Sequence, residues 1–279
     1  MTSIDPTKPI DVLVPTYNSA SYLDQALTAI KRSVPINRII AVDRYSSDRT
    51  FEILKNHEAE VYFENKSLGY ARQLLIEKAG TDVFMMLDSD VLISEADWYP
   101  NALKLLRNRN GEGRPVGAVV LLPMSRPPIP LQKYTEFWWR LIPALERNFF
   151  LTNSTLFLKD SVEGIRIPEE LGAAEDVYIW LHIRGRGYTT FTMKVRGIHH
   201  FAHGQKKGYW MGANLRILQK LVGKAALPFV IRNVMAYPAL ALVAAFFTKD
   251  ANVLKYNLKR WYGYLRGYLF PQKFYKISR

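Results

Sequence analysis

Two aspartates, Asp88 and Asp90, directly follow a short apolar run, Phe84–Leu87. A run without polar residues predicts a strand that is buried on both faces, as in a parallel sheet. Open α/β sheets bind their ligands at the carboxyl ends of such strands. Two carboxylates spaced two residues apart can share one hard cation, which phosphate oxygens also hold. We therefore predict a divalent-metal site here; the alternative is a solvated turn, because Asp and Ser are common at strand ends.

The elements that position this pair lie in the first 110 residues, where short apolar runs alternate with amphipathic segments. Strands that alternate with helices predict a parallel, doubly wound sheet flanked by helices. The expected strands are 10–15, 38–43, 60–64 and 84–87, and the expected helices begin near Ser19 or Ser21, near Asp48 or Thr50, and at Tyr70.

Beyond Gly111 this regular alternation ends. Further strands are expected at 116–122, 154–158 and 189–195, with helices at 134–145 and 175–184 and a proline-rich loop at 123–130.

The net charge of +13 is concentrated at one end of the chain. Residues 205–279 contain 14 Lys or Arg and one acid, Asp250, whereas the first 204 residues are balanced. Such asymmetry indicates a segment that meets an anionic surface. The chain has no cysteine, which excludes disulfides and thiolate chemistry. Met1–Pro9 lacks the apolar core of a signal peptide, so we expect the catalytic part to lie in the cytosol.

The basic segment also contains a strongly apolar stretch, Leu227–Phe247, which Arg232, Asn233 and Pro238 interrupt. Its length is marginal for a membrane span, and a central arginine is costly there. The following Lys255–Arg279 interleaves aromatic and basic residues, which favour the headgroup zone of an anionic membrane. We therefore expect interfacial helices; the alternatives are a packed helical subdomain or a nucleic-acid site, and no nucleic-acid motif is present.

Several segments, taken in their order and spacing, resemble the motifs of family 2 glycosyltransferases, which have the GT-A fold. The resemblance covers roughly residues 10–203, with Arg44 standing where the family has a second Asp. The matching segments are Val14–Asn18 (VPTYN), Val42–Thr50 (VDRYSSDRT), Asn65–Arg72 (NKSLGYAR), Asp88–Asp90 (DSD), and Glu175–Asp176 followed by Gly185–Tyr188.

This resemblance implies a site for a nucleotide-sugar donor with Mn²⁺ or Mg²⁺. The implied metal ligands are Asp88, Asp90 and a histidine, for which we favour His200 over its neighbours His199 and His203. Arg72 is implied to face the diphosphate, which a guanidinium fork binds well. The implied donor-binding residues are Pro15, Thr16, Tyr17, Asn18, Asp43, Gly69, Arg72, Asp88 and Ser89.

Two of these donor residues also have ordinary structural alternatives. The carboxylate of Asp43 can accept from a base N–H or from ribose hydroxyls, or it can simply form the turn after its strand. Tyr17 can stack on a nucleobase, or it can pack against the pocket wall.

Asp176 is the candidate general base, because an attacking hydroxyl must lose a proton and a positioned carboxylate can accept it. The adjacent Glu175 would raise the proton affinity of the pair by repulsion. The alternative is a pair of helix N-terminal acids stabilised by the helix dipole.

The chain is therefore predicted to be an inverting glycosyltransferase that moves sugar from a UDP- or GDP-sugar to a lipid-linked or other membrane-embedded acceptor. It is expected at the cytoplasmic face of the membrane as a peripheral or monotopic protein. The expected domains are 1–204, with a nucleotide-sugar half (10–120) and an acceptor half (121–204), and a helical membrane-associating region (205–279).

Three alternatives to this function remain open. A polyprenyl-phosphate sugar synthase has a phosphate acceptor and needs no base, so the role of Asp176 would lapse. A sugar-phosphate nucleotidyltransferase is disfavoured, because Pro15–Asn18 stands where those enzymes carry a glycine-rich loop. A non-catalytic membrane-surface scaffold is suggested only by Arg44.

Overall fold

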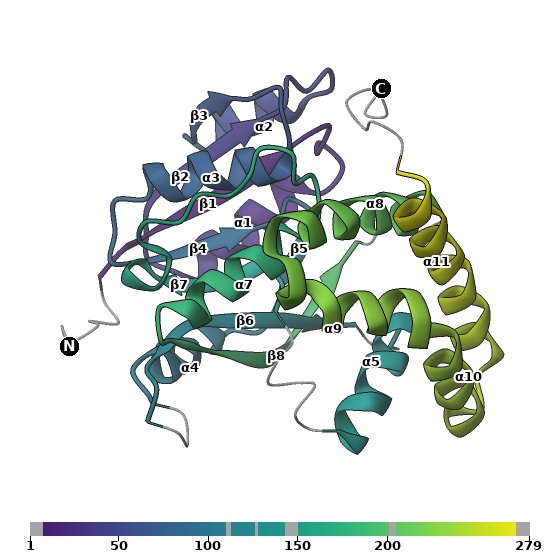
Figure 1. The fold of residues 1–279 in the computed structure, drawn as a ribbon. Coiled ribbons are helices and arrows are strands. Elements are labelled where there is room, and N and C mark those ends of the chain that lie inside the picture. The colour runs from purple at the N-terminus through teal and green to yellow at the C-terminus, as the bar shows by residue number, and fades with distance from the viewer. Residues whose placement is uncertain (1–7, 110–112, 126–127, 143–149, 201–204, 272–279) are drawn as a thin grey trace. The chain divides into compact units, whose positions relative to one another are not determined.

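The computed structural model describes residues 8–109, 113–125, 128–142, 150–200 and 205–271. In this part of the chain, eight strands form one sheet in the order β3-β2-β1-β4-β7-β6-β8-β5 (Figure 1). The pairs β1–β2, β2–β3, β1–β4 and β6–β8 are parallel, whereas β4–β7, β6–β7 and β5–β8 are antiparallel. The predicted α/β fold with a mostly parallel sheet is confirmed. The strands are β1 (Ile10–Thr16), β2 (Ile36–Asp43), β3 (Glu60–Phe63), β4 (Val83–Leu87), β5 (Val91–Ile93), β6 (Val116–Met124), β7 (Ser154–Leu158) and β8 (Thr189–His199).

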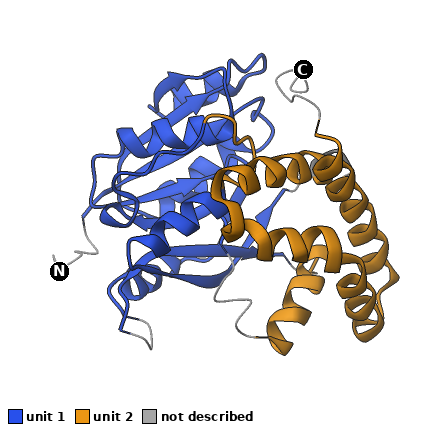
Figure 2. Cartoon of the chain, in the orientation of Figure 1, with its two compact units in different colours: residues 1–125, 147–168, 176–200 blue, residues 126–146, 169–175, 201–279 orange. Residues whose placement is uncertain are grey.

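The chain divides into two compact units (Figure 2). Unit 1 comprises residues 1–125, 147–168 and 176–200, and it contains the sheet. Unit 2 comprises residues 126–146, 169–175 and 201–279. The division into domains 1–204 and 205–279 stays a prediction.

Helices cover both faces of the sheet in unit 1, which is why its central strands are apolar throughout. Val12 and Met85 point to one face and pack with residues of α1, α2 and α4. Leu13 and Phe84 point to the other face and pack with α3 and α7. Each such side chain contributes about 1.5–3 kcal/mol by leaving water. The helices are α1 (Leu23–Ser33), α2 (Thr50–Asn56), α3 (Leu68–Lys78), α4 (Trp98–Leu106), the 3₁₀ helix η1 (Lys159–Val162) and α7 (Glu175–Gly185).

Five strands, β1, β2, β4, β6 and β8, extend beyond the predicted boundaries, and β8 does so by the most residues. β6 continues through Pro123, which the sequence placed in a loop. Proline is tolerated there because β7 pairs with β6 only over Ala118–Val120, which leaves the far end paired on one side. β8 runs to His199 rather than Val195, because its last residues pair with the short β5. Neither β5 nor α4 was predicted.

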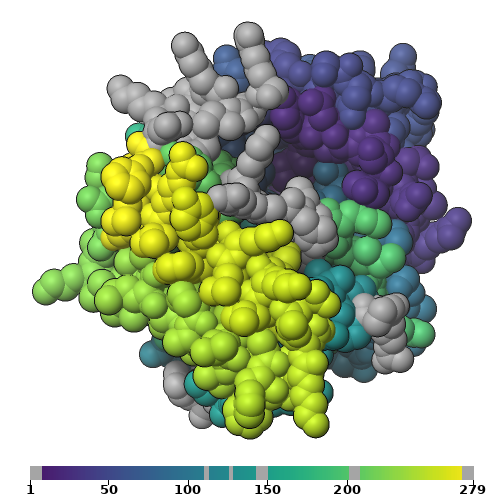
Figure 3. Space-filling view, turned by 90° about the vertical axis from the view of Figure 1, so that its right-hand side faces the viewer, coloured from purple at the N-terminus to yellow at the C-terminus, as the bar shows by residue number. Residues whose placement is uncertain are grey.

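Unit 2 is mostly helical in the residues that the structure describes, and its residues 169–174 form turns and bends. The stretch Gly208–Thr248 is the one described helical segment long and apolar enough to cross a membrane, by length and composition alone. In the space-filling view of Figure 3, α10 and α11, in yellow-green and yellow, lie open at the surface. The helices are α5 (Pro130–Leu141), α8 (Gln205–Val222), the 3₁₀ helix η2 (Gly223–Ala226), α9 (Leu227–Val230), the π-helix η3 (Ile231–Ala236), α10 (Tyr237–Thr248) and α11 (Ala251–Leu269).

Helices α8 and α11 approach each other through glycine. A Cβ on Gly212 would lie 2.1 Å from the carbonyl oxygen of Tyr264, and a Cβ on Gly267 would lie 1.9 Å from that of Tyr209. Real side chains do not tolerate such distances from backbone atoms, so glycine is required at both positions. The two helices therefore pack backbone against backbone, as helices in membranes often do.

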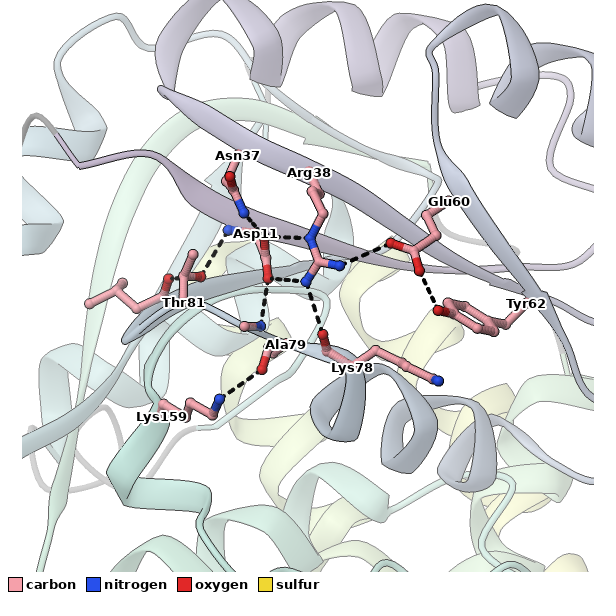
Figure 4. Close-up of polar contacts among 11 residues, drawn as sticks. Asp11, Asn37, Arg38, Glu60, Tyr62, Lys78, Ala79, Thr81 and Lys159 are labelled. Carbon is pink, nitrogen blue, oxygen red and sulfur yellow. Dashed lines mark hydrogen bonds and ion pairs between the residues drawn. The ribbon is translucent and has the colours of Figure 1, made fainter.

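A polar network joins the amino ends of the strands, at the edge of the sheet opposite Asp88 (Figure 4). The fully buried Asp11 accepts hydrogen bonds from Asn37 Nδ2 (2.8 Å), Arg38 Nη2 (3.0 Å) and the Gly80 amide (2.7 Å). Burial alone would raise the pKa of Asp11, but the bonds from Arg38, Gly80 and Asn37 outweigh it and lower the pKa. Hydrogen bonds to Asp11 therefore stabilise the amino ends of these strands.

Candidate active site

The carboxyl ends of β1 and β2 are joined by the carboxylate of Asp43. This side chain is buried and accepts from Thr16 Oγ1 (2.7 Å), the Ser46 amide (2.7 Å) and Ser46 Oγ (2.6 Å). These bonds match the turn interpretation of Asp43. A carboxylate has about four acceptor positions, so these three bonds leave about one position for a donor from a ligand.

The loop after β1 is held against the loop after β2. Asn18 adopts a left-handed conformation (φ +46°), and its Oδ1 accepts from the Ser47 amide at 2.9 Å. The Asn18 amide in turn donates to Ser46 Oγ at 2.8 Å. Pro15 is buried, whereas Tyr17 is 41 % exposed beside these loops. The first two sequence motifs thus form one surface, with the Tyr17 ring accessible to solvent.

Arg44, which replaces the family's second Asp, faces an acid from the neighbouring strand. Its Nε lies 4.0 Å from Oε1 of Glu64, the residue directly after β3. Burial raises the pKa of Glu64, although hydrogen bonding from the Lys66 amide and the charge of Arg44 act against it. A carboxylate is therefore present near position 44, but it comes from β3.

Asp88 is held by the guanidinium of Arg72. Nη2 of Arg72 lies 3.0 Å from Oδ1 of Asp88, and the arginine side chain is only 3 % exposed. Arg72 lies on α3 one turn after Gly69. Ser67 is the N-cap of this helix, and its Oγ accepts from the Tyr70 amide. The third and fourth motifs therefore meet at one ion pair.

Ser89 Oγ donates to Ser19 Oγ at 2.8 Å. This bond connects the aspartate pair to the loop after β1.

Asp90 faces a histidine at the end of β8. Its Oδ1 lies 3.4 Å from Nε2 of His199, and the other ring nitrogen of His199 lies 3.0 Å from Nδ2 of Asn153. The ring of the next residue, His200, instead stacks on Tyr22 with centroids 4.0 Å apart. His200 is the first residue after β8, but its amide still donates to the Asp90 carbonyl at 2.9 Å, so the backbone stays extended and the two adjacent imidazoles point to opposite faces.

The assignment of His200 as a metal ligand stays a prediction, and His203 lies outside the described residues. Among the described residues, no group of three or more His, Asp or Glu side chains is arranged to hold a metal ion.

Glu175 and Asp176 begin α7, as predicted. Glu175 is buried, and Oδ1 of Asp176 accepts from the Val177 amide at 2.8 Å. The preceding Ala174 has φ +62°, a conformation that costs a non-glycine residue energy. The pair is thus fixed at a strained helix start, and its role as base stays a prediction.

Two contributors to this site were not predicted. Asn153 precedes β7, an antiparallel strand that starts at the carboxyl end of β4, and its carbonyl accepts from the Asp88 amide at 2.7 Å. Tyr22 stacks on His200 from the loop before α1. Neither belongs to a motif that local sequence would reveal.

Known proteins resemble this chain in both sequence and fold. The family model described as glycosyl transferase family 2 matches residues 11–161, more than half of the chain, and the chain belongs to this family. An uncharacterised glycosyltransferase of Haemophilus influenzae is 31% identical over 93 residues, which is 30% of this chain and 37% of that protein. The poly(ribitol-phosphate) β-N-acetylglucosaminyltransferase TarS of Staphylococcus aureus is 26% identical over 184 residues, 59% of this chain and 30% of TarS. The chain thus spans about a third of the length of these curated relatives.

Solved structures show the same fold at low identity. A mannosyltransferase from Pyrobaculum calidifontis, in complex with GDP-Man and Mn²⁺, aligns with a TM-score of 0.65 at 18% identity, covering 95% of this chain and 86% of that one. Glucosyl-3-phosphoglycerate synthase from Mycobacterium tuberculosis, in complex with Mn²⁺, UDP and glucosyl-3-phosphoglycerate, aligns with a TM-score of 0.53 at 16% identity, covering 77% of this chain and 80% of that one. The predicted family and GT-A fold are therefore confirmed.

Proposed function

We propose that this chain transfers a sugar, with inversion, from a UDP- or GDP-sugar to a membrane-embedded, lipid-linked acceptor. The observation that carries this function is the meeting of Arg72, Asp88, Asp90 and His199 at one sheet edge, beside the loops that contain Tyr17. Family membership supports the reaction class, and the complexes of the Pyrobaculum and Mycobacterium enzymes support a nucleotide-sugar donor.

Asp88 and Asp90 are the proposed ligands of Mn²⁺ or Mg²⁺. The carboxylate of Asp90 and the imidazole of His199 form an oxygen–nitrogen donor pair 3.4 Å apart, which suits Mn²⁺. Cations bound to nucleotides usually take few protein ligands and fill the rest with phosphate oxygens and water. When bound, the metal supplies Lewis-acid stabilisation of the charge on the departing diphosphate.

Arg72 would bind the diphosphate while keeping its bond to Asp88. Its guanidinium is already oriented by the ion pair, so little side-chain entropy is lost on binding. The Tyr17 ring would stack on the base, and Asp43 would fix the loops that receive the ribose. These chain residues bind and orient the donor.

Asp176 would accept the proton of the attacking hydroxyl, with Glu175 raising its proton affinity. An inverting reaction needs one such base and one displacement. We place the reaction at the cytoplasmic face of a membrane, with unit 2 as the anchor. Its support is the apolar segment Gly208–Thr248 and its exposed large side chains, among them Met235, Leu242, Phe246 and Phe247.

The metal assignment is tested by Asp90→Ala, with Asp82→Ala as its matched control. Asp82 directly precedes β4, at the end of the strand opposite Asp88 and Asp90, and its side chain is 77 % exposed. We expect Asp90→Ala to abolish divalent-dependent turnover with an unchanged melting temperature, and Asp82→Ala to behave as wild type. Normal activity of Asp90→Ala would reject the assignment. His199→Ala and His200→Ala, titrated with Mn²⁺ in parallel, identify the histidine that affects metal affinity.

The donor is identified by a thermal-shift screen of UDP-, GDP- and dTDP-sugars with Mn²⁺. A sugar donor should raise the melting temperature of wild type, and the metal-dependent part of the shift should vanish in Asp90→Ala. No stabilisation by any nucleotide sugar would contradict the proposed activity and favour a scaffold.

A further inference from the structure

Tyr17, Arg44 and Glu64 directly follow β1, β2 and β3, and they stand in one row at the carboxyl ends of these strands. The last residues of the three strands are paired in register. The ladder continues one step further, because the Arg44 amide donates to the Thr16 carbonyl at 2.9 Å. The Glu64 amide likewise donates to the Asp43 carbonyl at 3.1 Å. Since neighbouring strands lie about 4.8 Å apart, the backbone of Arg44 directly adjoins those of the other two residues.

The Arg44 side chain lies on the face of the sheet that α3 covers. Ile40 and Val42 of β2 pack with residues of α3, and alternation along the strand directs Arg44 to the same face. Nε of Arg44 lies 4.0 Å from Oε1 of Glu64, so these two side chains share that face. The helix α3 also carries the proposed diphosphate ligand. Arg44 therefore lies between Tyr17, the proposed stacking ring, and the side of the sheet that receives the diphosphate.

The guanidinium of Arg44 has donors that the protein does not use. In the part of the chain that the structure describes, the contact of Nε with Glu64 is the one polar contact of this side chain. The Arg44 side chain is 27 % exposed, whereas that of Glu64 is 2 % exposed. With Nε toward Glu64, the edge formed by Nη1 and Nη2 is left for a ligand.

The backbone next to Arg44 is fixed in an unfavourable conformation. Tyr45 has φ +50°, a left-handed conformation that costs a tyrosine energy. Its ring stacks on Phe63 with the centroids 5.2 Å apart. Such strain persists where the surrounding structure enforces it, and it is frequent at ligand sites. Here it fixes the direction in which the chain leaves β2 at Arg44.

A fork of donors selects a nucleobase by its acceptors, because arginine has no acceptor of its own. Guanine presents two neighbouring acceptors, O6 and N7, and an arginine fork binds both at once. Adenine has an amino donor in place of O6, and cytosine also presents an amino donor. Uracil separates its two carbonyl groups by an N–H donor. Guanine is therefore the base that matches the Nη1–Nη2 edge of Arg44.

We propose, resting on the glycosyl transfer proposed above, that Arg44 binds O6 and N7 of a guanine base that stacks on Tyr17. Arg44 is then a specificity-determining residue, which makes the chain select GDP-sugars over UDP-sugars. It contacts the base and takes no part in the transfer itself.

The test is isothermal titration calorimetry of the full chain with nucleoside diphosphates at a constant Mn²⁺ concentration. We expect GDP to bind about tenfold more tightly than UDP, and about tenfold more tightly than ADP, whose purine ring stacks equally well. IDP lacks only the 2-amino group of guanine, so it should bind like GDP. The 7-deaza analogue of GDP lacks N7 and keeps O6, so it should bind about threefold more weakly than GDP.

The variant Arg44→Gln should lose the preference for GDP over ADP, because glutamine pairs with N6 and N7 of adenine instead. The control Arg49→Gln removes the same charge from a side chain that is 76 % exposed and pairs with Glu52, and it should keep the preference. Arg44→Lys retains the charge but not the fork, so its preference for GDP should fall while it still binds nucleotides. This variant replaces Arg44→Gln if circular dichroism shows Arg44→Gln unfolded.

Three results would overturn the assignment of Arg44. An equal loss of affinity for all nucleoside diphosphates in Arg44→Gln would mean that this residue binds the diphosphate. A wild-type preference for UDP or ADP would exclude guanine as the base. Binding of IDP as weak as that of ADP would mean that the 2-amino group is recognised, and not O6 and N7.

The same titrations separate this inference from the proposed function. Binding of nucleoside diphosphates without a base preference would overturn the role of Arg44 alone. Binding of no nucleoside diphosphate would overturn the proposed glycosyl transfer, and the role of Arg44 with it.

Discussion

Replacing Gly267 by alanine tests the close packing of α8 and α11. The new Cβ would start 1.9 Å from the Tyr209 carbonyl oxygen, whereas ordinary contact begins at 3.4 Å, so the helices must separate locally by 1.5 Å. Overpacking costs about 1–3 kcal/mol, and the upper end applies because a helix backbone cannot rotate away. Alanine recovers about 1 kcal/mol through helix propensity. The net loss is about 2 kcal/mol, or a melting temperature lower by about 4–8 °C.

Circular dichroism at 222 nm measures this change, with Gly185→Ala as the matched control. Gly185 also lies in a helix, but a Cβ there meets nothing within 4 Å. The control should be as stable as wild type or up to about 1 kcal/mol more stable. Hydrogen exchange should accelerate in α8 and α11 of Gly267→Ala alone. Equal melting temperatures of the two variants would refute the glycine-mediated packing.

Two further predictions concern unit 1. Asp11→Asn should destabilise the protein by about 2 kcal/mol at pH 7, discounted because its partner Arg38 is partly exposed. The pKa of Asp11 in the folded protein lies below the ordinary 3.8, so its contribution to stability is present above about pH 4 and is lost on further acidification. The melting temperatures of wild type and Asp11→Asn should therefore converge as the pH falls below about 4. A difference in melting temperature that stays constant with pH would contradict the lowered pKa. Arg72→Lys should lower kcat/KM by about 10–100-fold at unchanged stability, because lysine lacks the fork that holds Asp88. Arg166→Lys is the control, because the Arg166 side chain is 83 % exposed. Kinetics of Arg72→Lys equal to those of this control would exclude the role of Arg72.

Local sequence predicted the central strands well. β7 has the predicted bounds, Ser154–Leu158, and β4 exceeds its prediction by one residue. Such short apolar runs, bounded by polar residues, leave few alternatives to a buried strand. α4 was missed because Pro100 lies within its first turn and its segment is short.

The histidines show where local reasoning fails. Residues 197–199 are strand because β5 pairs with them, although β5 lies about a hundred residues earlier and has three residues. Only this pairing decides that His199, and not His200, faces Asp90. Tertiary context sets strand ends in a way that propensity does not record.

The sequence predicted only some features of unit 2. The apolar and basic composition predicted helices, but the inclusion of α5 depends on contacts such as Lys133–Asp250, which join residues 117 positions apart. The glycine packing did have a signal, because Gly208 and Gly212 are four residues apart, as are Gly263 and Gly267. Such spacing is typical of closely packed helices.

The close approach of β8 to β5 has a consequence for how this end of the sheet tolerates insertions and deletions. A Cβ on Gly197 would lie 2.4 Å from the Leu92 carbonyl oxygen, so this glycine keeps β8 close against β5 in one alignment. A one-residue slip would exchange the faces of all following side chains. An insertion or deletion in β8 before Gly197 would therefore place a side chain against the Leu92 carbonyl and move His199 away from Asp90.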